Sequence, residues 1–393
     1  MKRILFVYHV TSVGGGSYCL LSILKAIDRT FFEPMVLLPQ KGPLCDEIEK
    51  LGIEIVYFPS LVLYPYNKSL FKWRTLSTLR KIQRCQKGFA EVVRRMSPDI
   101  VYMNTMMLFP YLKTTKECGC KTLIHVREHW PLNEHKRQLE WARKCVYQYA
   151  DKMIAINRYS ASMFPQKEAT IVYDWIDMDS RYKPMPLSEI FGEDMTGKKV
   201  LLYTGGMQRI KGAYEIVRSF VENVKDENCR LLVMGFTKEL SGSGKKGKIK
   251  MLMYILGIPT YEYKVKMLAR QDKRIVCIPG VYEIKDIVEQ ADCMVSYFTT
   301  PHANLAMAES IILGTPVIAA NTDEAQEYSL NGKLATLFEM NNIRAYNDAI
   351  KSFVNGNNLE SKMSEEDREK IRILFSKERN TGVLNNALKE LIG

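Results

Sequence analysis

The stretch Val200-Leu201-Leu202-Tyr203-Thr204-Gly205-Gly206 decides the fold class of the second half of the sequence. It is a short apolar run that ends in a pair of glycines, which is typical of a buried strand followed by a tight turn. Strand, glycine turn and amphipathic helix in this order indicate a parallel sheet wrapped by helices. The apolar residues of the helix that follows share one face: Ile216, Val217, Phe220, Val221 and Val224.

Short apolar runs alternate with longer helical patterns along the whole chain. This alternation predicts an α/β protein with two Rossmann-like domains, each built on a parallel sheet. The length of 393 residues also suits two domains, since a single core rarely grows beyond ~250–300 residues. The predicted strands span residues 4–10, 34–38, 53–58, 100–103, 122–126 and 153–156 in the first half, and 200–204, 230–234, 275–278, 293–297 and 316–319 in the second.

Domain boundaries follow from the same patterns. Residues 1–183 form the predicted N-terminal domain and residues 200–370 the C-terminal one, with 184–199 as the linker. The stretch 365–391 has the pattern of a polar helix, and we expect its last part, 371–393, to pack back on the N-terminal domain. The linker prediction rests on turn-forming residues: Pro184, Pro186, Gly192 and Gly197.

The composition is that of a folded protein, with 46% apolar and 25% charged residues. Nine cysteines form no C-x-x-C pair, so we expect reduced thiols inside a cytoplasmic protein. The apolar run 4–10 is short for a signal peptide and has no cleavage site after it. No uncharged window approaches the ~18 residues that a membrane-spanning helix needs, so we expect a protein that is soluble or lies on a membrane surface.

The net charge of +12 lies almost entirely in the first half of the chain. Residues 1–183 carry 28 Lys and Arg against 17 Asp and Glu, whereas residues 184–393 carry 28 against 27. This excess predicts an anionic partner for the N-terminal half, which could be phospholipid, a phosphorylated substrate or nucleic acid.

The excess is densest between residues 68 and 95, where aromatic side chains are interleaved with cations and Glu91 is the one acid. Aromatic and basic residues together suit the headgroup region of an anionic membrane; a solvated helix face is the alternative. No recognised nucleic-acid motif accompanies them, so we do not expect nucleic acid to bind. The residues expected at this membrane or acceptor face are Lys68, Lys72, Trp73, Arg74, Arg80, Lys81 and Arg84.

Two glycine-rich turns follow the first predicted strand of each domain. Gly14-Gly15-Gly16-Ser17 opens a predicted helix at 18–27, where free backbone N–H groups can hold a phosphate. It lacks the G-x-G-x-x-G spacing of dinucleotide sites, so a structural tight turn and a contact with a diphosphate or an acceptor both fit. In the second turn, Gly205-Gly206 leads to Arg209 and Lys211. A lysine at such a helix start can neutralise a diphosphate leaving group; a solvated basic helix start is the alternative.

A third segment places a carboxylate in an apolar helix. Asn304 is the predicted N-cap of a short helix over 304–313, and Gly314 is its predicted C-terminal stop. Glu309 lies inside this helix, and a buried carboxylate needs a partner or a ligand. Two hydrogen bonds to a ribose diol would satisfy it, and an ion pair within the protein is the alternative.

These segments resemble the retaining glycosyltransferases of the GT-B fold, with family 4-like motifs, a large family that includes sucrose synthases, mannosyltransferases and polysaccharide-assembly enzymes. The resemblance covers nearly the whole chain and is strongest over residues 200–335. It implies two Rossmann-like domains that face each other across a cleft, the N-terminal one for the acceptor and the C-terminal one for a nucleotide sugar. Its motifs are matched by Gly14-Gly15-Gly16, Lys211-Gly212, Glu309, Gly314-Thr315-Pro316-Val317 and Glu327.

By this resemblance Lys211 contacts the donor phosphates, with Arg209 beside it, and Glu309 holds the nucleotide ribose. In similar enzymes a histidine after the strand predicted at 122–126 lies near the reacting sugar. His125 and Glu128 are therefore the predicted site residues of the N-terminal domain, and a structural role for either is equally open. The remaining predicted donor-binding residues are Gly15, Gly16, Gly205, Gly206, His302, Asn304 and Leu305.

Three positions depart from the family pattern. Pro301 stands where relatives usually carry a glutamate, eight residues before Glu309, and Gly206 stands where they carry an arginine. Asp174-Trp175 replaces an Asn-Gly turn. Arg209 can replace the missing arginine from a shifted position, and His302 or Asn304 can supply polar contacts to the sugar.

We therefore expect retaining, metal-independent transfer of a sugar from a nucleotide sugar to a glycan or lipid-linked acceptor, in surface polysaccharide or glycolipid assembly. Asp177-Met178-Asp179 resembles a metal-binding D-x-D, but it lies before the linker rather than at a central strand end, so no metal or other cofactor is expected. The expected location is the cytoplasm, on the inner face of the plasma membrane. A non-catalytic nucleotide-sugar or membrane-binding protein and a nucleotide-sugar epimerase remain the alternatives.

Overall fold

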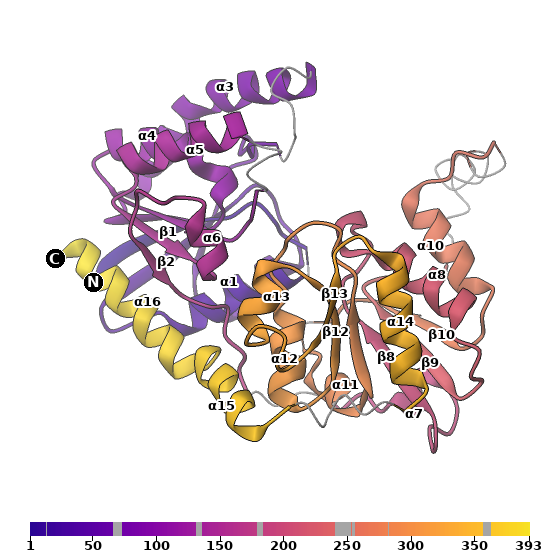
Figure 1. Cartoon of the computed structure of the whole chain (residues 1–393). Helices are drawn as coiled ribbons and strands as arrows, with labels where there is room; N and C mark the ends of the chain where they lie inside the picture. The colour runs from indigo at the N-terminus through magenta and orange to yellow at the C-terminus, as the bar shows by residue number, and fades with distance from the viewer. Residues whose placement is uncertain are drawn as a thin grey trace. The chain divides into compact units, whose positions relative to one another are not determined.

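The computed structural model describes residues 1–12, 14–65, 73–130, 136–178, 184–239, 253, 256–281, 283–356 and 363–393. Its contacts divide the chain into two compact units, which are coloured along the chain in Figure 1. Unit 1 is Met1–Asp177 together with Leu374–Gly393, and unit 2 is Met178–Ile373. The chain therefore enters unit 2 once and returns to unit 1 for its last residues.

Unit 1 is built on a seven-stranded parallel sheet in the order β3-β2-β1-β4-β5-β6-β7. The strand order reverses between β1 and β4, so the carboxyl ends of these two strands form a switch point, where ligands bind in doubly wound folds. Its strands are β1 (Lys2–Val7), β2 (Phe32–Leu38), β3 (Glu54–Tyr57), β4 (Ile100–Met103), β5 (Lys121–Val126), β6 (Lys152–Ala155) and β7 (Ala169–Ile171).

One face of this sheet packs on α3, η1, α4 and α5, since their apolar residues share a core with alternate strand residues such as Leu5 and Val7. Strand residues that point to either face of the sheet are buried, as expected for parallel strands covered on both faces. The helices between the strands are α1 (Gly15–Ala26), α2 (Pro43–Lys50), α3 (Trp73–Met96), the 3₁₀ helix η1 (Met106–Tyr111), α4 (Leu112–Glu117), α5 (Lys136–Tyr149) and α6 (Arg158–Ser162).

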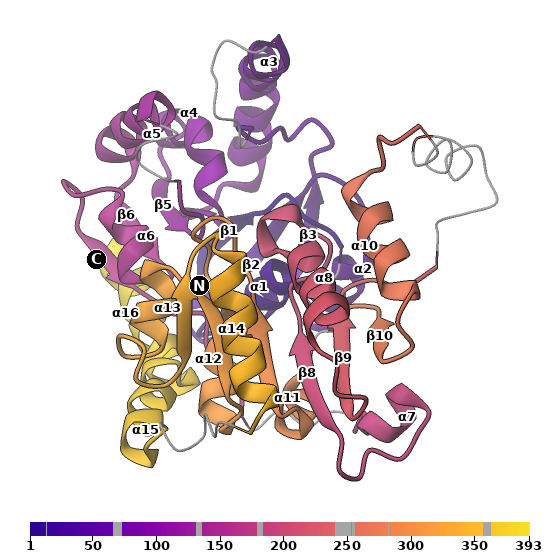
Figure 2. The same cartoon turned by 45° about the vertical axis from the view of Figure 1, so that its right-hand side comes forward.

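Unit 2 repeats the same strand order with six parallel strands, β10-β9-β8-β11-β12-β13. Its switch point lies between β8 and β11, and β8 can be followed beside β9 in Figure 2. Its strands are β8 (Lys199–Tyr203), β9 (Cys229–Met234), β10 (Ile275–Ile278), β11 (Cys293–Ser296), β12 (Val317–Asn321) and β13 (Thr336–Glu339).

The helices α8, α10 and α14 cover one face of this second sheet, and α7 and α11 cover the other. α8 buries Ile216, Val217 and Phe220, the face that the periodicity predicts. The helices of unit 2 are α7 (Leu187–Phe191), the 3₁₀ helix η2 (Arg209–Lys211), α8 (Ala213–Asn223), α10 (Tyr261–Arg270), α11 (Lys285–Gln290), α12 (Leu305–Leu313), α13 (Asp323–Tyr328), α14 (Ile343–Val354) and α15 (Glu365–Leu374).

All eleven predicted strands are present, with ends that differ by at most three residues. Two strands were not predicted, β7 and β13. Both lie at an edge of their sheet, and each is at most four residues long and partly exposed. A short, half-exposed edge strand leaves no continuous apolar run in the sequence.

The C-terminal stretch predicted as a single polar helix consists of two helices, α15 and α16 (Lys377–Ile392). The break occurs at Ser376, whose hydroxyl accepts from the Arg379 N–H and caps α16. Just before it, Phe375 is buried against Tyr173 of unit 1, with ring centroids 5.1 Å apart. An aromatic anchor followed by an N-cap thus ends one helix and begins the next.

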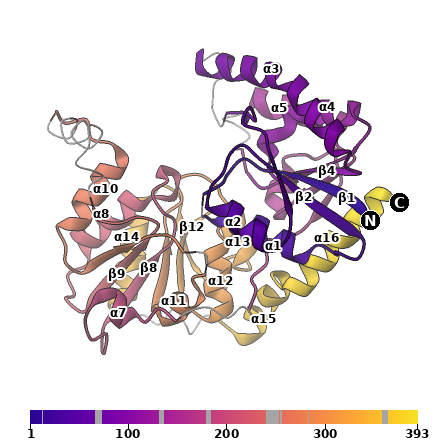
Figure 3. The same cartoon turned by 180° about the vertical axis from the view of Figure 1, so that it is seen from behind.

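Helix α16 is part of the core of unit 1. The Asn385 amide donates to the Ala26 carbonyl at 2.9 Å and accepts from the Asp28 N–H at 3.0 Å, which fixes α16 to the end of α1 (Figure 3). The Lys389 ammonium lies 2.8 Å from the Asp28 carboxylate. Leu384 and Leu388 of α16 are fully buried.

The stretch 184–199, predicted as a linker, contains the helix α7 and belongs to unit 2. Leu187 is buried there against Val200, Leu202 and α11, because its apolar side chain covers the sheet face that α8 leaves open. The nine cysteines are all free thiols. In the part of the chain that the structure describes, no helix has the length and apolar character needed to cross a membrane.

The burial of α16 predicts a large cost for truncating its core residues. Leu388→Ala should lower the free energy of unfolding by about 2–5 kcal/mol, because it leaves a cavity under α16. Chemical denaturation followed by circular dichroism measures this. Ile373→Ala, at an exposed position of α15, is the control and should change stability by less than about 0.5 kcal/mol. Equal effects of the two substitutions would contradict the packing of α16 on unit 1.

Candidate functional site

Two glycines allow the turns after β8 and β9 to touch backbone to backbone. Gly206 has a left-handed φ of 66° and Gly235 a φ of 102°. A Cβ added at Gly235 would lie 2.5 Å from the Gly206 Cα. The Gly206 N–H donates to the Met234 carbonyl at 3.2 Å, and its own carbonyl accepts from the Tyr203 hydroxyl at 2.9 Å. A Cβ at Gly205 would collide with the Tyr203 ring, so this turn is closed to side chains.

The turn continues into η2, which carries Arg209 and Lys211 to the start of α8. Gly212 follows with a φ of 73° and is the N-cap of α8. Lys211 is half-buried, and burial lowers the pKa of its ammonium. No described residue accepts a hydrogen bond from this ammonium or forms an ion pair with it. Arg209 is exposed. The site therefore holds a partly desolvated cation beside a helix N-terminus, which is an arrangement that attracts anions.

The segment after β11 lies against this cationic turn. The Thr299 N–H donates to the Ile210 carbonyl at 2.8 Å, and a Cβ at Gly212 would collide with Tyr297. His302 comes next. Burial, together with the positive charge of Lys211, lowers the pKa of His302 to about 4. The imidazole is therefore neutral at pH 7 and is available for hydrogen bonds.

Helix α12 confirms the predicted capping of the 304–313 helix. The Asn304 side chain accepts from the Met307 N–H at 3.4 Å, and its amide donates to the Ser296 hydroxyl at 3.1 Å. Gly314 ends the helix with a φ of 88°. Leu305 is the first residue of the helix and is half-buried. The start of α12 is thus fixed at the carboxyl end of β11, at the switch point.

Glu309 lies one turn inside α12 and has no protein partner among the described residues. Its side chain is half-buried, and no described residue donates a hydrogen bond to its carboxylate or forms an ion pair with it. Burial, and then the negative charge of Glu283, raise the pKa of Glu309 to about 8, whereas Lys285 acts in the opposite direction. The sequence left two explanations open for Glu309, a ligand and an ion pair within the protein. The described residues form no ion pair with it.

In unit 1, the predicted glycine turn opens α1. Gly14 is its N-cap and provides no side chain. A Cβ at Gly16 would lie 2.6 Å from the Tyr8 hydroxyl, so this position is closed to side chains. A Cβ at Gly14 or Gly15 would meet no described atom within 4 Å. The first turn of α1 therefore has no room for a side chain at Gly16, whereas the space around Gly15 is open.

His125 and Glu128, the predicted N-terminal site residues, differ in how they are held. His125 is 1% exposed, its Nδ1 lies 2.7 Å from the Tyr102 hydroxyl, and burial holds its pKa well below the usual value. Burial raises the pKa of Glu128. Its carboxylate accepts from the Met106 N–H at 2.9 Å and from the Thr105 hydroxyl at the start of η1. Both carboxylate oxygens of Glu128 thus accept hydrogen bonds within the protein. Nε2 of His125 makes none within the described chain.

The sequence did not predict two features at the carboxyl end of the unit 1 sheet, where His125 and Glu128 lie. Arg127 points its Nη2 at both oxygens of Asp174, at 2.7 and 2.6 Å, and both side chains are largely buried. Asn104, directly after β4, is fully buried, and neither side-chain amide atom has a hydrogen-bond partner among the described residues. A polar residue directly after a buried strand was the available signal for Asn104. No local signal links Arg127 to Asp174, which lie 47 residues apart.

The predicted membrane face falls on α3 and on the residues before it. Lys68 and Lys72 lie outside the described residues, as does the side chain of Arg74. Trp73 is 73% exposed at the start of α3, and the Arg80 guanidinium lies 5.8 Å from its ring centroid. Lys81 and Arg84 are exposed as well.

The D-x-D segment does not form a metal site among the described residues. Asp177 forms an ion pair with Lys377 at 2.9 Å, and Asp179 lies outside the described residues. The described residues hold no group of three or more His, Cys, Asp or Glu side chains placed to bind a metal ion.

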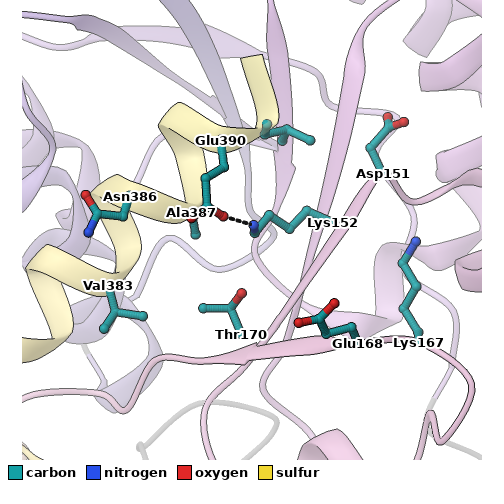
Figure 4. A pocket seen from close by; sticks show the side chains of 10 residues that line it. Asp151, Lys152, Lys167, Glu168, Thr170, Val383, Asn386, Ala387 and Glu390 are labelled. Atoms are coloured by element: carbon teal, nitrogen blue, oxygen red, sulfur yellow. Dashed lines mark hydrogen bonds and ion pairs between the residues drawn. The ribbon is translucent and has the colours of Figure 1, made fainter. Parts of the chain in front are cut away.

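A pocket of about 710 Å³ lies in unit 1 between β6, β7 and α16 (Figure 4). Asp151 and Lys152 line it at the amino-terminal end of β6, and Lys152 pairs there with Glu390 at 2.6 Å. The pocket is thus at the opposite end of the strands from the glycine turns and the buried histidine, and it does not belong to the candidate site.

Comparison with known proteins decides the class. Residues 191–370, which run from the end of α7 into α15, match the model of the family glycosyl transferases group 1. The chain is a glycosyltransferase. The matched segment of this glycosyltransferase contains both glycine turns of unit 2, Lys211 and Glu309. No curated protein sequence matches the chain.

Solved structures show that the glycosyltransferase has the GT-B fold. Anabaena HepE in complex with UDP and glucose is similar with a TM-score of 0.73 at 16% identity, over 99% of this chain and 100% of that one. A Rickettsia africae glycosyltransferase reaches 0.67 at 18% identity, over 100% and 98%. Sucrose-phosphate synthase from Thermosynechococcus elongatus reaches 0.70 at 13% identity, over 100% and 99%. At these identities the likeness shows the fold alone.

The contact between the two glycine turns predicts a specific cost for adding a methyl group. Gly235→Ala should destabilise unit 2 by the strain of a left-handed alanine, about 1–2 kcal/mol, plus about 1–3 kcal/mol for overpacking against Gly206. Gly197→Ala is the matched control, because Gly197 has a φ of 71° and open space around it. Thermal unfolding measures both. Equal losses at the two positions would contradict a close approach of the two turns.

Proposed function

We propose that this glycosyltransferase takes its sugar from a nucleotide sugar that binds at the carboxyl edge of unit 2. One observation carries the proposal: the Lys211 ammonium and the Glu309 carboxylate, both at least half-buried near this edge, have no partner among the described residues. A desolvated charge or a buried carboxyl group without a partner is costly, and a nucleotide diphosphate would complement both. Its phosphates suit Lys211 and the α8 N-terminus, and its ribose diol suits Glu309.

We propose UDP as the nucleotide, because the solved HepE complexes contain UDP and UDP-glucose. Gly205 and Gly206 would let the diphosphate approach the backbone closely, since a Cβ at Gly205 would collide with Tyr203 and Gly206 has a left-handed φ. Arg209, exposed beside Lys211, would add a second cation from its shifted place. Gly206 itself has a left-handed φ, which disfavours the arginine that relatives carry there.

The chemistry proposed for the site is departure of the diphosphate with retention at the anomeric carbon. The bond between that carbon and the phosphate oxygen breaks, and its electron pair stays on the UDP. The acceptor oxygen bonds to the same face of the carbon, and its proton passes to a phosphate oxygen. Lys211 and the α8 N-terminus would stabilise the charge that develops on the leaving diphosphate, a role that makes a divalent metal unnecessary.

The sugar itself would be contacted from the segment before α12. Pro301 provides no carboxylate where relatives have one, but the neutral imidazole of His302 lies close enough to Lys211 for its charge to lower the histidine pKa. We propose that His302 and Asn304 hydrogen bond to sugar hydroxyls. His125, with a free Nε2 and a neutral ring, is the proposed contact to the reacting sugar from unit 1, and Gly15 the proposed backbone contact in the first glycine turn.

The proposed acceptor is a glycan or lipid-linked glycan at the cytoplasmic face of an anionic membrane, in surface polysaccharide or glycolipid assembly. Exposed Trp73 and Leu76, followed by Arg80, Arg84 and Lys87, fall on one face of α3 at helical spacing. An indole at headgroup depth and a row of cations support attachment to anionic lipid without a membrane-spanning segment.

Glu309→Ala should abolish nucleotide binding. UDP, GDP and ADP are added to the wild type and the variant, and thermal unfolding is followed. At 100 times its dissociation constant the correct nucleotide should stabilise the wild type by about 2.7 kcal/mol, and the variant should lose this shift. Glu222→Ala, an exposed glutamate on α8, is the matched control and should keep it. Equal shifts in wild type and Glu309→Ala would contradict the ribose assignment.

The pH dependence gives a second readout of the same site. With a pKa of about 8, Glu309 is mostly protonated in the free protein at pH 6, and the carboxylate must lose its proton to accept both ribose hydroxyls. The ratio of wild-type to Glu309→Gln affinity for UDP should therefore rise as pH increases to about 8 and level off above it. A ratio that does not change with pH would contradict this role of the carboxylate.

Turnover separates the remaining alternatives. Release of UDP from a UDP-sugar that depends on an added acceptor supports transfer. Binding of UDP-sugars without any turnover would favour a non-catalytic binding protein, and conversion of the donor sugar without an acceptor would favour an epimerase.

Attachment to membranes is tested by co-sedimentation with vesicles that contain phosphatidylglycerol. Replacing both Arg80 and Arg84 by Glu should weaken partitioning at least about 30-fold, because each lost cation near an anionic surface costs about 1 kcal/mol. Lys273→Glu with Lys351→Glu on unit 2 makes the same change in net charge and should leave partitioning nearly unchanged. Identical binding by the two double variants would show that net charge alone, and not α3, attracts the lipid.

A further inference from the structure

The carboxyl edge of the unit 1 sheet contains buried polar atoms that the protein leaves without partners. Both side-chain amide atoms of Asn104, Nε2 of His125 and Nη1 of Arg127 are buried and make no hydrogen bond within the described chain. Asn104 is fully buried, His125 is 1% exposed, and the Arg127 side chain is 9% exposed. Nδ1 of His9, two residues after β1, is also buried without a hydrogen bond within the described chain.

These atoms come from neighbouring strands. Asn104 follows β4, Arg127 follows β5, and His125 is the second-last residue of β5, which pairs with β4. The charge of Arg127 influences the pKa of His125, Tyr102 and Tyr8, so its guanidinium lies near these side chains. This is the switch-point edge of the sheet, where doubly wound folds bind their ligands.

Unpaired buried polar atoms are rare in folded proteins, and each costs free energy unless protein, water or ligand satisfies it. Unit 1 contains a contrasting example. Asn380 is also fully buried, but its amide accepts from the Tyr173 N–H at 2.9 Å and donates to the carbonyls of Leu374 and Ser376 at 2.9 and 2.8 Å. The protein thus satisfies a buried asparagine where its role is structural, and leaves Asn104 unsatisfied at the edge where ligands bind.

The charges of the group indicate what kind of ligand it suits. Both oxygens of Asp174 already bond to Arg127, so the guanidinium charge is neutralised within the protein. Burial lowers the pKa of His9 to about 4 and holds that of His125 well below its usual value, so both rings are neutral at pH 7. Asn104 carries no charge. The group therefore offers hydrogen-bond donors and acceptors without a net charge, which suits hydroxyl groups and leaves a phosphate without a counter-charge.

We propose that Asn104 and Arg127, next to His125, form an acceptor subsite for an uncharged, hydroxyl-rich sugar, as opposed to a sugar phosphate. The proposal rests on the proposed function and narrows the class of acceptor. The excess positive charge of the first half lies elsewhere, on exposed cations such as Arg80 and Arg84 of α3. An acceptor can therefore combine an anionic lipid part, held by α3, with a neutral sugar that enters the subsite.

Asn104→Leu is the variant that tests the subsite, with Asn380→Leu as the matched control. Leucine has the same number and branching of side-chain non-hydrogen atoms as asparagine and removes both polar amide atoms. Because the Asn104 side chain makes no hydrogen bond within the described chain, its replacement should leave the midpoint of thermal unfolding unchanged or raise it. Asn380→Leu breaks four hydrogen bonds, since the amide oxygen also accepts from the Arg379 guanidinium at 3.2 Å, and should lower the midpoint by several degrees. A loss of similar size for Asn104→Leu would overturn the proposal, since it would show that Asn104 has a structural partner such as buried water.

Binding is measured by saturation-transfer NMR on the full chain without donor, with maltose, cellobiose and lactose as neutral probes and glucose 6-phosphate and fructose 6-phosphate as anionic ones. At least one neutral disaccharide should bind the wild type, and Asn104→Leu should weaken that binding about tenfold or more. Stronger binding of the sugar phosphates would overturn the proposal. So would the absence of binding by every neutral probe, or equal binding by wild type and Asn104→Leu.

UDP binding, measured on the same proteins, separates this subsite from the donor site. Asn104→Leu should keep the UDP-induced thermal shift of the wild type, because the substitution lies in unit 1. If UDP fails to bind the wild type, the donor assignment fails, and the sugar-binding result still decides the acceptor subsite by itself.

Discussion

The backbone of Gly206 packs against the backbone of Gly235, and the carboxyl edge of unit 2 depends on this contact. The two turns follow β8 and β9, which are paired strands, and a Cβ on Gly235 would lie 2.5 Å from the Gly206 Cα and push the turns apart. Gly206 itself has a left-handed φ, which disfavours a side chain there. With the turns closed, η2 begins close to the sheet, and Gly212 can fit under Tyr297 to start α8. The place of Lys211 is therefore set by steric exclusion at Gly212 and Gly235 and by the left-handed backbone of Gly206, more than by any bond of its own.

Unit 1 and unit 2 have the same strand order but opposite chemistry at the corresponding edge. In unit 2 the edge holds two ionisable groups that lack partners among the described residues, the ammonium of Lys211 and the carboxyl group of Glu309. In unit 1 the arginine of the group is neutralised by Asp174, and the remaining unpaired atoms belong to uncharged rings and an amide. A charged group suits a diphosphate and a neutral group suits hydroxyls, so one architecture can serve both halves of a transfer reaction.

The sequence was sufficient to predict those features whose pattern lies within a few neighbouring residues. The cap at Asn304, the stop at Gly314 and a lysine on a glycine turn are each readable within a few residues, and the structure has them where the pattern predicts. The pairing of Arg127 with Asp174 was not readable, because it depends on the sheet order that brings the end of β5 near the chain after β7. The lack of partners for Asn104 was equally hidden, since it is a property of everything packed around the residue. The edge strands β7 and β13 were missed because half-exposed strands carry no apolar run.

The return of α16 to unit 1 has a consequence for how the chain folds during synthesis. Unit 2 is an insertion within unit 1, since the residues on both sides of it, up to Asp177 and from Leu374, belong to the same compact body. On the ribosome, unit 2 can complete all its contacts while the core of unit 1 still lacks Leu384 and Leu388. Unit 1, although most of it is translated first, cannot complete its core until these last residues have been synthesised. A polypeptide shortened at its carboxyl end would therefore leave the core of its N-terminal half incomplete.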